Sequence, residues 1–180
     1  MSLSEKFDLD DLDKSIIMIL QKNPNITHSE IAKKIGRSQP AVGSRIHKLE
    51  DKGVLSAQFG IDFRVANINL IKVEIATRKP EEIFHMAKYC PFIINAMKLS
   101  GEKNIMLYMA SSSLKKLDNV INYHFRNKDY INDVKMDIVT DYLKPFVLPI
   151  DFEMDDHDPD LTNGCGEKCS VRLAEAEGRY

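Results

Sequence analysis

The stretch that decides the fold is THSEIAKKIGRSQPAVGSRIHKLEDKGVL, residues 27–55. It begins with Thr27 and, three positions later, Glu30, which is the capping-box pattern: each side chain accepts a hydrogen bond from the backbone N–H of the other residue at a helix start. Gly36 is suited to the left-handed cap at the end of that helix, and Ser38 can cap the next one. The stretch therefore predicts two short helices joined by a tight turn.

The second of these helices is expected over residues 38–52. Pro40 is tolerated in its first turn, and Gly53 ends it. One face carries apolar side chains at helical spacing, namely Val42, Ile46 and Leu49. This face is expected to be buried against the helices that precede it.

A third helix is predicted before this pair, and an extended segment after it. The apolar residues of the first helix recur every three or four positions and are Leu9, Leu12, Ile16, Ile19 and Leu20. Asp8 is the expected N-cap, and residues 23–25 (Asn-Pro-Asn) end the helix. Residues 54–63 have strand character and are expected to supply a wing.

Two helices around a glycine-containing turn form the helix-turn-helix pattern, whose second helix lies in the DNA major groove. Residues 33–48 carry basic side chains and no acid, which suits a phosphate-facing surface. The DNA-contact candidates are Ser38, Gln39, Pro40, Ser44, Arg45, His47 and Lys48. Gln39 matches an adenine edge, whereas Arg45 and Lys48 are expected to hold phosphates. The alternatives are a helical bundle with a solvated basic face and a helix-turn-helix that no longer binds DNA.

The periodicity changes after residues 64–69, a polar segment expected to be a hinge. The pattern then predicts strand, helix, strand, strand, helix and strand over residues 71–75, 80–89, 92–99, 105–110, 114–125 and 134–138. This β-α-β-β-α-β order is the ferredoxin-like arrangement. Its helices would cover one sheet face, and a second copy of the chain is the simplest cover for the other, apolar face.

The chain is thus expected to be an α+β protein in four parts. A winged helix-turn-helix domain covers residues 1–63, the hinge 64–69, a βαββαβ oligomerisation and effector domain 70–152, and an acidic, cysteine-containing tail 153–180 that is partly ordered at most. The 180 residues carry a net charge of −2 and three cysteines. Neither a secretory signal nor a membrane-spanning stretch is recognisable. The low number of cysteines argues against a secreted disulfide scaffold, and the expected compartment is therefore the cytoplasm.

Three segments resemble the Lrp/AsnC (feast/famine) family of prokaryotic transcription regulators: residues 9–13, 31–36 and 45–55. The resemblance is strong over the first third of the chain and consistent in order through about Phe152. It implies a winged helix-turn-helix joined to an αβ-sandwich (RAM-type) domain that dimerises through its sheet, assembly into larger rings, and response to amino acids. It also implies DNA contacts at Ser38, Gln39, Ser44, Arg45 and Lys48, of which Arg45 lies in the most recognisable motif.

The same resemblance places an amino-acid site between subunits near a Gly-x-x-Asp turn. Here the turn is Gly101-Glu102-Lys103-Asn104, so Gly101 fits and Asn104 replaces the acid. Because an ammonium group prefers a carboxylate, the sequence favours an ordinary hairpin turn, where Gly and Asn are expected for backbone reasons. The effector-site candidates that the resemblance gives are Gly101, Glu102 and Asn104.

The tail holds two cysteines four positions apart, Cys165 and Cys169, with Lys168 beside the second. The pattern favours uncommitted thiols, ahead of a redox switch and ahead of a metal ion or iron–sulfur cluster. A closed metal site needs about four ligands, so His157, Cys90 or the tail of a second subunit would have to complete it. Cys90 is otherwise expected to be a small buried hydrophobe, and His157 a solvated surface residue.

A sirohaem-decarboxylase-like enzyme on the same two-domain layout is the competing function. Such an enzyme is expected to use a pocket rich in His and Arg, whereas the second and third predicted strands carry Asn95, Lys98 and Tyr108 and no histidine. No nucleophile–base pair or carboxylate pair has catalytic spacing. The sequence therefore predicts a non-enzymatic regulator that binds double-stranded DNA and itself but no membrane, and that responds to an amino acid, another small molecule, a redox change or a metal.

Overall fold

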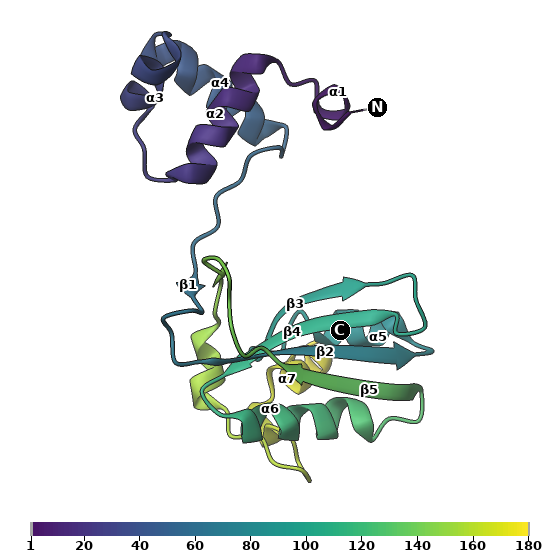
Figure 1. Cartoon of the computed structure of the whole chain (residues 1–180). Coiled ribbons are helices and arrows are strands. Elements are labelled where there is room, and N and C mark those ends of the chain that lie inside the picture. The colour runs from purple at the N-terminus through teal and green to yellow at the C-terminus, as the bar shows by residue number, and fades with distance from the viewer. Residues whose placement is uncertain (1, 180) are drawn as a thin grey trace. The chain divides into compact units, whose positions relative to one another are not determined.

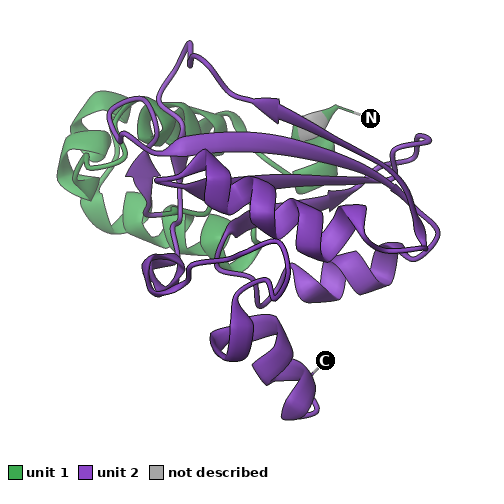
Figure 2. Ribbon diagram, turned by 90° about the horizontal axis from the view of Figure 1, so that it is seen from below, with its two compact units in different colours: residues 1–58 green, residues 59–180 purple. Residues whose placement is uncertain are grey.

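The computed structural model describes residues 2–179 and divides into two compact units, residues 1–58 and residues 59–180 (Figures 1 and 2). The first unit contains four helices within its described residues: α1 (Leu3–Phe7), α2 (Asp11–Lys22), α3 (His28–Ile35) and α4 (Gln39–Asp51). Its core is small and lies between the helices and the loop before α3, and its buried side chains are Ile16, Ile26, Ile31, Ala32, Val42 and Ile46. The predicted three-helix arrangement of α2, α3 and α4 is confirmed.

The predicted caps of the helix pair are present. The Thr27 hydroxyl accepts from the Glu30 backbone N–H at 3.2 Å, and the Glu30 carboxylate accepts from the Thr27 N–H at 2.9 Å. Gly36 ends α3 in the left-handed conformation, with φ of 64°. The Ser38 hydroxyl accepts from the Ala41 N–H at 3.4 Å and so caps α4.

The predicted cap of the first helix was wrong by two residues. Asp10, and not Asp8, caps α2: its carboxylate accepts from the Asp13 N–H at 2.8 Å, and the Asp13 carboxylate accepts in return from the Asp10 N–H at 3.3 Å. Asp8 instead ends α1 with φ of 51°. Because α1 was not predicted, the sequence pattern assigned its terminal residue to the wrong helix.

The wing and the hinge are corrected by the structure. Within residues 54–63, only β1 (Ile61–Asp62) is a strand, and it pairs antiparallel with β6 (Val147–Leu148) of the second unit. A side chain at Gly60 would place its Cβ 2.2 Å from the Leu148 carbonyl oxygen, so only glycine fits there. Of residues 64–69, the first three belong to a turn of the second unit, where the amides of Val65 and Ala66 donate to the Asp62 carbonyl at 3.1 Å, and Asn69 already begins a strand.

The second unit contains the predicted βαββαβ order. Its elements are β2 (Asn69–Thr77), α5 (Pro80–Met86), β3 (Ile93–Lys98), β4 (Ile105–Ser111), α6 (Leu114–Ile121) and β5 (Ile131–Ile138). The strands are antiparallel in the order β3-β4-β2-β5. Both helices lie on one side of this sheet (Figure 2).

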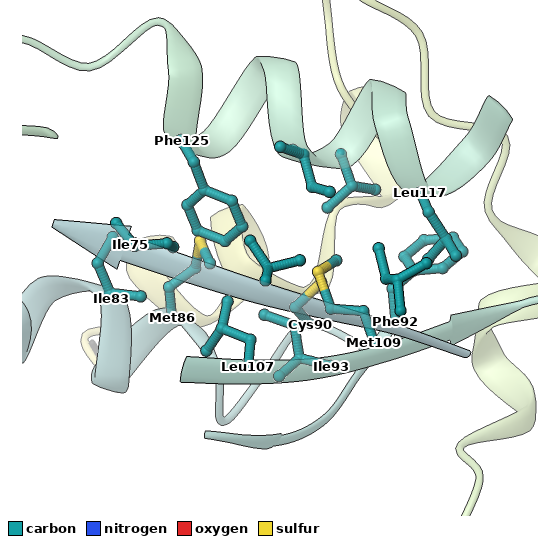
Figure 3. Packing of buried hydrophobic residues seen from close by; sticks show 14 of the residues in the cluster. Ile75, Ile83, Met86, Cys90, Phe92, Ile93, Leu107, Met109, Leu117 and Phe125 are labelled. Atoms are coloured by element: carbon teal, nitrogen blue, oxygen red, sulfur yellow. The ribbon is translucent and has the colours of Figure 1, made fainter. Parts of the chain in front are cut away.

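The core lies between this sheet and its helices. Ile71, Val73 and Ile75 alternate along β2 and are fully buried, as the period of two in the sequence predicts. Phe92 and Phe125, the largest of the fully buried side chains, fill the same layer (Figure 3). Burying each such side chain contributes roughly 1.5–3 kcal/mol to stability.

The tail is ordered, which corrects the expectation that it is partly ordered at most. It forms η2 (Phe152–Asp156), η3 (Gly166–Lys168) and α7 (Ser170–Ala176). Three tail side chains, Met154, Cys169 and Val171, are buried in the core of the second unit. The tail therefore completes this core.

Polar contacts fix the tail to the helical layer. The Asn119 side chain donates to the Pro159 carbonyl at 2.8 Å, and the Lys116 ammonium donates to the His157 carbonyl at 2.6 Å. Near the end of the chain, the Tyr89 hydroxyl donates to the Arg179 carbonyl at 2.7 Å. The tail thus runs from α6 across to α5. Over residues 2–179, no helix is long and apolar enough to cross a membrane.

Candidate nucleic-acid interface

Helix α4 has one buried face and one exposed edge. Val42, Ile46 and Leu49 are almost fully buried against α2 and α3. The predicted DNA-contact residues other than Arg45 are exposed: Ser38, Gln39, Pro40, Ser44, His47 and Lys48. The apolar stripe therefore holds the helix in place while its polar edge stays open to a partner.

The start of α4 suits an anion. Ser38 caps the helix and Pro40 stands in its first turn, which contains no acid. The exposed backbone N–H groups and the helix dipole at such an end attract phosphate. Farther along, His47 lies 3.3 Å from the Glu50 carboxylate, whereas Lys48 has no ion-pair partner within residues 2–179.

Three further basic side chains are exposed next to this helix start. Lys33 and Lys34 belong to the last turn of α3, and Arg37 lies in the turn before α4. Together with Lys48 they form a set of cations that we call the basic edge. The charge pattern of the sequence indicated these residues, but it did not place them among the individual contact candidates.

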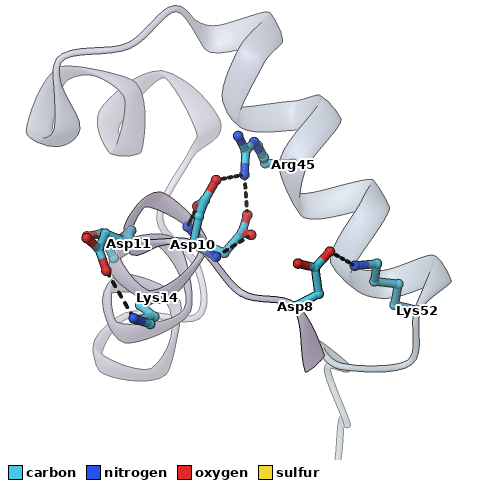
Figure 4. A network of polar contacts seen from close by, with 8 residues as sticks. Asp8, Asp10, Asp11, Lys14, Arg45 and Lys52 are labelled. Carbon is cyan, nitrogen blue, oxygen red and sulfur yellow. Dashed lines mark hydrogen bonds and ion pairs between the residues drawn. The ribbon is translucent and has the colours of Figure 1, made fainter. Parts of the chain in front are cut away.

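Arg45 has a different environment from the one predicted (Figure 4). Its Nη1 contacts the carboxylates of Asp10 and Asp13, the latter at 3.0 Å, and the Asp13 side chain is only 8% exposed. The Asp13 backbone N–H and the Arg45 guanidinium hold the pKa of Asp10 below its usual value. Arg45 thus ties α4 to the start of α2, and the phosphate contact expected from sequence is not favoured.

Gly43 also serves packing within the unit. A Cβ added at this position would lie 3.4 Å from Nδ1 of His28 on α3. The glycine therefore allows α3 and α4 to approach closely.

The predicted effector turn is tied into the sheet. The Asn104 side chain donates to the Thr77 carbonyl at 2.8 Å and accepts from the Thr77 N–H at 3.0 Å. Lys103 pairs with Asp133, while Gly101 and Glu102 are exposed. Because both polar atoms of the Asn104 amide bond the β2 backbone, the geometry favours the ordinary hairpin turn for Asn104 and leaves Glu102 as the exposed acid on the turn.

The tail candidates separate into two groups. Cys165 is half-buried and Cys169 is buried, and they are neighbours. His157 is buried rather than solvated, with Nδ1 2.7 Å from the Glu153 carbonyl and Nε2 2.9 Å from the Lys168 carbonyl. Neither ring nitrogen is therefore available to a metal. Cys90 lies in the core (Figure 3), as predicted for a small hydrophobe.

The described part of the chain contains no group of three or more His, Cys, Asp or Glu side chains arranged to hold a metal ion. Two residues near the cysteines were missed by the sequence analysis. Tyr123 and His124 lie on η1 (Asn122–Arg126), one turn of π-helix that continues α6. The helical period of the sequence gave no signal for a π turn, so their orientation toward the tail was not predictable.

A family model described as winged helix-turn-helix DNA-binding matches residues 9–56, the range that holds α2, α3 and α4. The HTH-type transcriptional regulator LrpA of Pyrococcus horikoshii is 29% identical over 140 residues, which cover 76% of this chain and 99% of that protein. LrpA of Bacillus subtilis is 27% identical over 128 residues, covering 68% and 93%. The chain is thus similar over most of its length to transcription regulators of the Lrp/AsnC type.

Solved structures of regulators share the fold of this chain. E. coli AsnC superposes with a TM-score of 0.64 at 19% identity, covering 77% of this chain and 97% of AsnC. The regulator NMB0573 of Neisseria meningitidis, in a complex with L-Met, gives a TM-score of 0.65 at 19% identity, covering 78% and 96%. The predicted fold class, family and DNA-binding regulatory function are confirmed, and the enzyme alternative receives no support from the relatives.

Proposed function

We propose that this Lrp/AsnC regulator reads DNA through the N-terminal half of α4 and binds the flanking phosphates through the basic edge. The observation that carries the proposal is the division of α4 into a buried stripe and an exposed polar edge. Gln39 and Ser44, exposed in the first two turns, are the base-reading candidates. Lys48 and the other basic-edge residues supply sequence-independent affinity.

Two substitutions on α4 separate these roles. Lys48→Ala is expected to weaken binding to every duplex and to reduce the slope of log K against log salt by about 0.9, the share of one phosphate. Gln39→Ala is expected to relax preference between sequences while leaving the salt slope unchanged. Fluorescence anisotropy on a genomic promoter duplex and a shuffled duplex, at several salt concentrations, measures both.

Lys22→Ala is the matched control, because Lys22 is an exposed lysine of the same unit at the end of α2. It should change neither the salt slope nor the preference. If Lys22→Ala and Lys48→Ala reduced affinity equally, binding would depend on total charge alone, and the proposed interface would be wrong.

Self-association through the open face of the sheet is the second part of the proposal. Contrary to the sequence expectation of an apolar face, Lys72 lies 3.4 Å from Glu74 and 3.2 Å from Asp137. The apolar part is carried by Met97, Met106 and Tyr108 on β3 and β4. Such a face suits a dimer interface in which the apolar side chains are buried at the centre and the ion pairs lie at the rim.

Analytical ultracentrifugation tests this interface. Met106→Lys places a cation in the apolar part and is expected to convert the dimer to monomer, with the secondary structure retained. Lys115→Glu, a charge change of exposed α6 on the opposite layer, is the control and should leave the dimer intact. A Met106→Lys chain that remains dimeric would move the interface to another surface.

An amino-acid effector belongs to the same proposal, since the N. meningitidis regulator of the same fold was solved with L-Met. Glu102, exposed on the hairpin turn, is the carboxylate we assign to the ligand's ammonium group. Amino acids that raise the melting temperature of the wild-type chain should lose this effect in Glu102→Gln. An equal rise in both proteins would exclude Glu102.

A further inference from the structure

The two tail cysteines are held side by side. The η3 turn, Gly166–Lys168, folds the chain back between them, with Gly166 in the left-handed conformation at φ of 64°. The Cys165 and Cys169 side chains belong to the same hydrophobic cluster, and each shifts the pKa of the other. Two sulfurs in contact within one short turn need little chain movement to form a disulfide.

The two thiols differ in access. Cys169 is 2% exposed and packs in the core of the second unit. Cys165 is half-buried and lines a surface cavity of about 380 Å³. The other lining residues are mostly polar and are Asp158, Asp160, Asn163, Gly164, Gly166, Glu167 and Arg172. A small polar oxidant therefore reaches the pair from the Cys165 side.

The π turn η1 places two aromatic residues against this pair. His124 is buried, and its side chain lowers the pKa of Cys169. Tyr123 packs against Gly164, where an added Cβ would lie 2.7 Å from Tyr123 Cδ1. Single π turns inside helices are uncommon and occur frequently at functional sites. The π turn therefore places His124 beside the buried Cys169, and it places Tyr123 against Gly164 in the loop that carries the half-buried Cys165.

The surroundings favour a thiolate within the pair. The Cys165 thiol and, to a smaller extent, the His124 side chain lower the pKa of Cys169, although burial acts in the opposite direction. For Cys90, burial outweighs the backbone hydrogen bonds of Phe92 and Ile93 and raises the pKa of its thiol to about 12. The thiolate is the nucleophilic form of cysteine, so chemistry is expected at the pair and not at Cys90.

We propose that Cys165 and Cys169 are a redox-active dithiol that hydrogen peroxide or an organic hydroperoxide closes to a disulfide. The contact with Cys169 and burial raise the pKa of Cys165, so the thiolate is favoured on Cys169, and the attacking Cys165 thiolate forms only when the Cys165 proton passes to Cys169. The placement of one accessible sulfur, one buried sulfur and a buried histidine distinguishes this site from two uncommitted surface thiols.

The reaction balances in two steps. The Cys165 thiolate attacks one peroxide oxygen, the O–O bond breaks, and the products are a Cys165 sulfenic acid and hydroxide, or an alkoxide from a hydroperoxide. The Cys169 thiol then attacks the Cys165 sulfur, the S–O bond breaks, and the S–S bond forms. The Cys169 proton and the leaving hydroxide make water. The two sulfurs together give two electrons to the peroxide.

Intact mass and peptide mapping of the full-length chain, reduced and then treated with hydrogen peroxide, test the site. The wild type should lose two hydrogen atoms and retain one of its three thiols for alkylation. A peptide joining Cys165 to Cys169 should appear and be lost on reduction. Cys90→Ala should behave as the wild type. A gain of oxygen without this cross-link, or a cross-link that includes Cys90, would overturn the proposal.

Single variants test the order of events. Cys169→Ser should stop at a sulfenic acid on Cys165, trapped by dimedone, whereas Cys165→Ser should give neither cross-link nor trapped product. Cys165 is the less buried of the two, so its variant keeps the test available if Cys169→Ser fails to fold. A Cys165→Ser chain that is oxidised at Cys169 as fast as the wild type would refute the assigned order.

A readout beyond oxidation separates chemistry from packing. His124→Gln should move the pH dependence of Cys165 alkylation upward, because the thiolate loses a stabilising partner, while circular dichroism stays unchanged. Metal analysis of the freshly purified, reduced chain gives the opposing outcome. A stoichiometric soft metal ion that blocks alkylation of both thiols would make the pair a ligand set and overturn the redox assignment.

Discussion

Replacing Arg45 should destabilise the DNA-reading unit and not remove a phosphate contact. In the structure, Nη1 of Arg45 lies 3.0 Å from the Asp13 carboxylate and also contacts Asp10. In Arg45→Ala, the Asp13 carboxylate keeps only the Asp10 backbone N–H, at 3.3 Å, as a hydrogen-bond donor. The substitution therefore leaves a buried charge without its cation.

The expected cost follows from the burial of Asp13, which is 6% exposed. Leaving a buried acceptor without its partner costs roughly 1–3 kcal/mol. The Arg45 side chain is 34% exposed, so water reaches part of the site and keeps the cost within this range instead of the larger cost of a fully buried pair. Exchange of the α2 and α4 amides should accelerate about tenfold for each 1.4 kcal/mol lost.

Hydrogen exchange is the suitable assay because intrinsic fluorescence has no tryptophan or tyrosine probe in this unit. The chain contains no tryptophan, and all six tyrosines lie beyond residue 58. Lys48→Ala, three positions along the same helix, is the matched control: its amide exchange should equal that of the wild type while its salt slope for DNA falls. A double-mutant cycle with Asp13→Asn should recover a coupling energy between Arg45 and Asp13.

The reverse result would refute this reasoning. If Arg45→Ala exchanged as slowly as the wild type and lost DNA affinity with the salt slope of one phosphate, the guanidinium would be a DNA ligand. The contact with α2 would then form only in the absence of DNA.

Three further outcomes are expected. The Arg64 side chain and backbone N–H lower the pKa of Asp62 from 3.8 to about 2. The stability that Asp62 provides is therefore complete above pH 3.8 and is lost as the pH falls toward about 2. In urea titrations followed by tyrosine fluorescence, the difference in stability between wild type and Asp62→Asn should shrink over that window, and a constant difference would contradict this. Gly164→Ala should make the tail more sensitive to limited proteolysis, because the φ of residue 164 is 59° and the added Cβ would meet the Tyr123 ring. Adding Tyr123→Ala should restore protection only in part, because the backbone strain at residue 164 remains. Asn104→Asp should keep the hydrogen bond from the Thr77 N–H but lose the hydrogen bond to the Thr77 carbonyl. The loss should lower the free energy of unfolding by about 1 kcal/mol. An unchanged urea midpoint would show that the hydrogen bond to the Thr77 carbonyl does not stabilise the fold.

The features that were predictable from sequence depend on neighbours in the chain. Thr27 and Glu30 cap α3 from three positions apart, and Gly36 ends it. The alternation of Ile71, Val73 and Ile75 likewise needs only a period of two to identify the buried face of β2. Caps, periods and turns are local, and they are sufficient to predict the helix-turn-helix and the βαββαβ order.

The features that were missed depend on distant partners. Residues 61–62 pair with β6 and not with a local wing, and Arg45 is taken by carboxylates more than thirty positions earlier. Asn104 looked like a turn residue, but its amide is bonded to Thr77. The acidic composition of the tail hid Met154, Cys169 and Val171, which the core buries. No local pattern encodes such contacts.

The short ladder between β1 and β6 has a mechanical consequence. Gly60 lies against the Leu148 backbone, so the first residues after the DNA-reading unit are fastened to the segment that leads directly into the tail. Loss of these two residue pairs would free residues 59–62 and so lengthen the chain that connects the DNA-reading unit to the sheet. The linker and the segment that leads into the tail are thus both held by the pairing of β1 with β6.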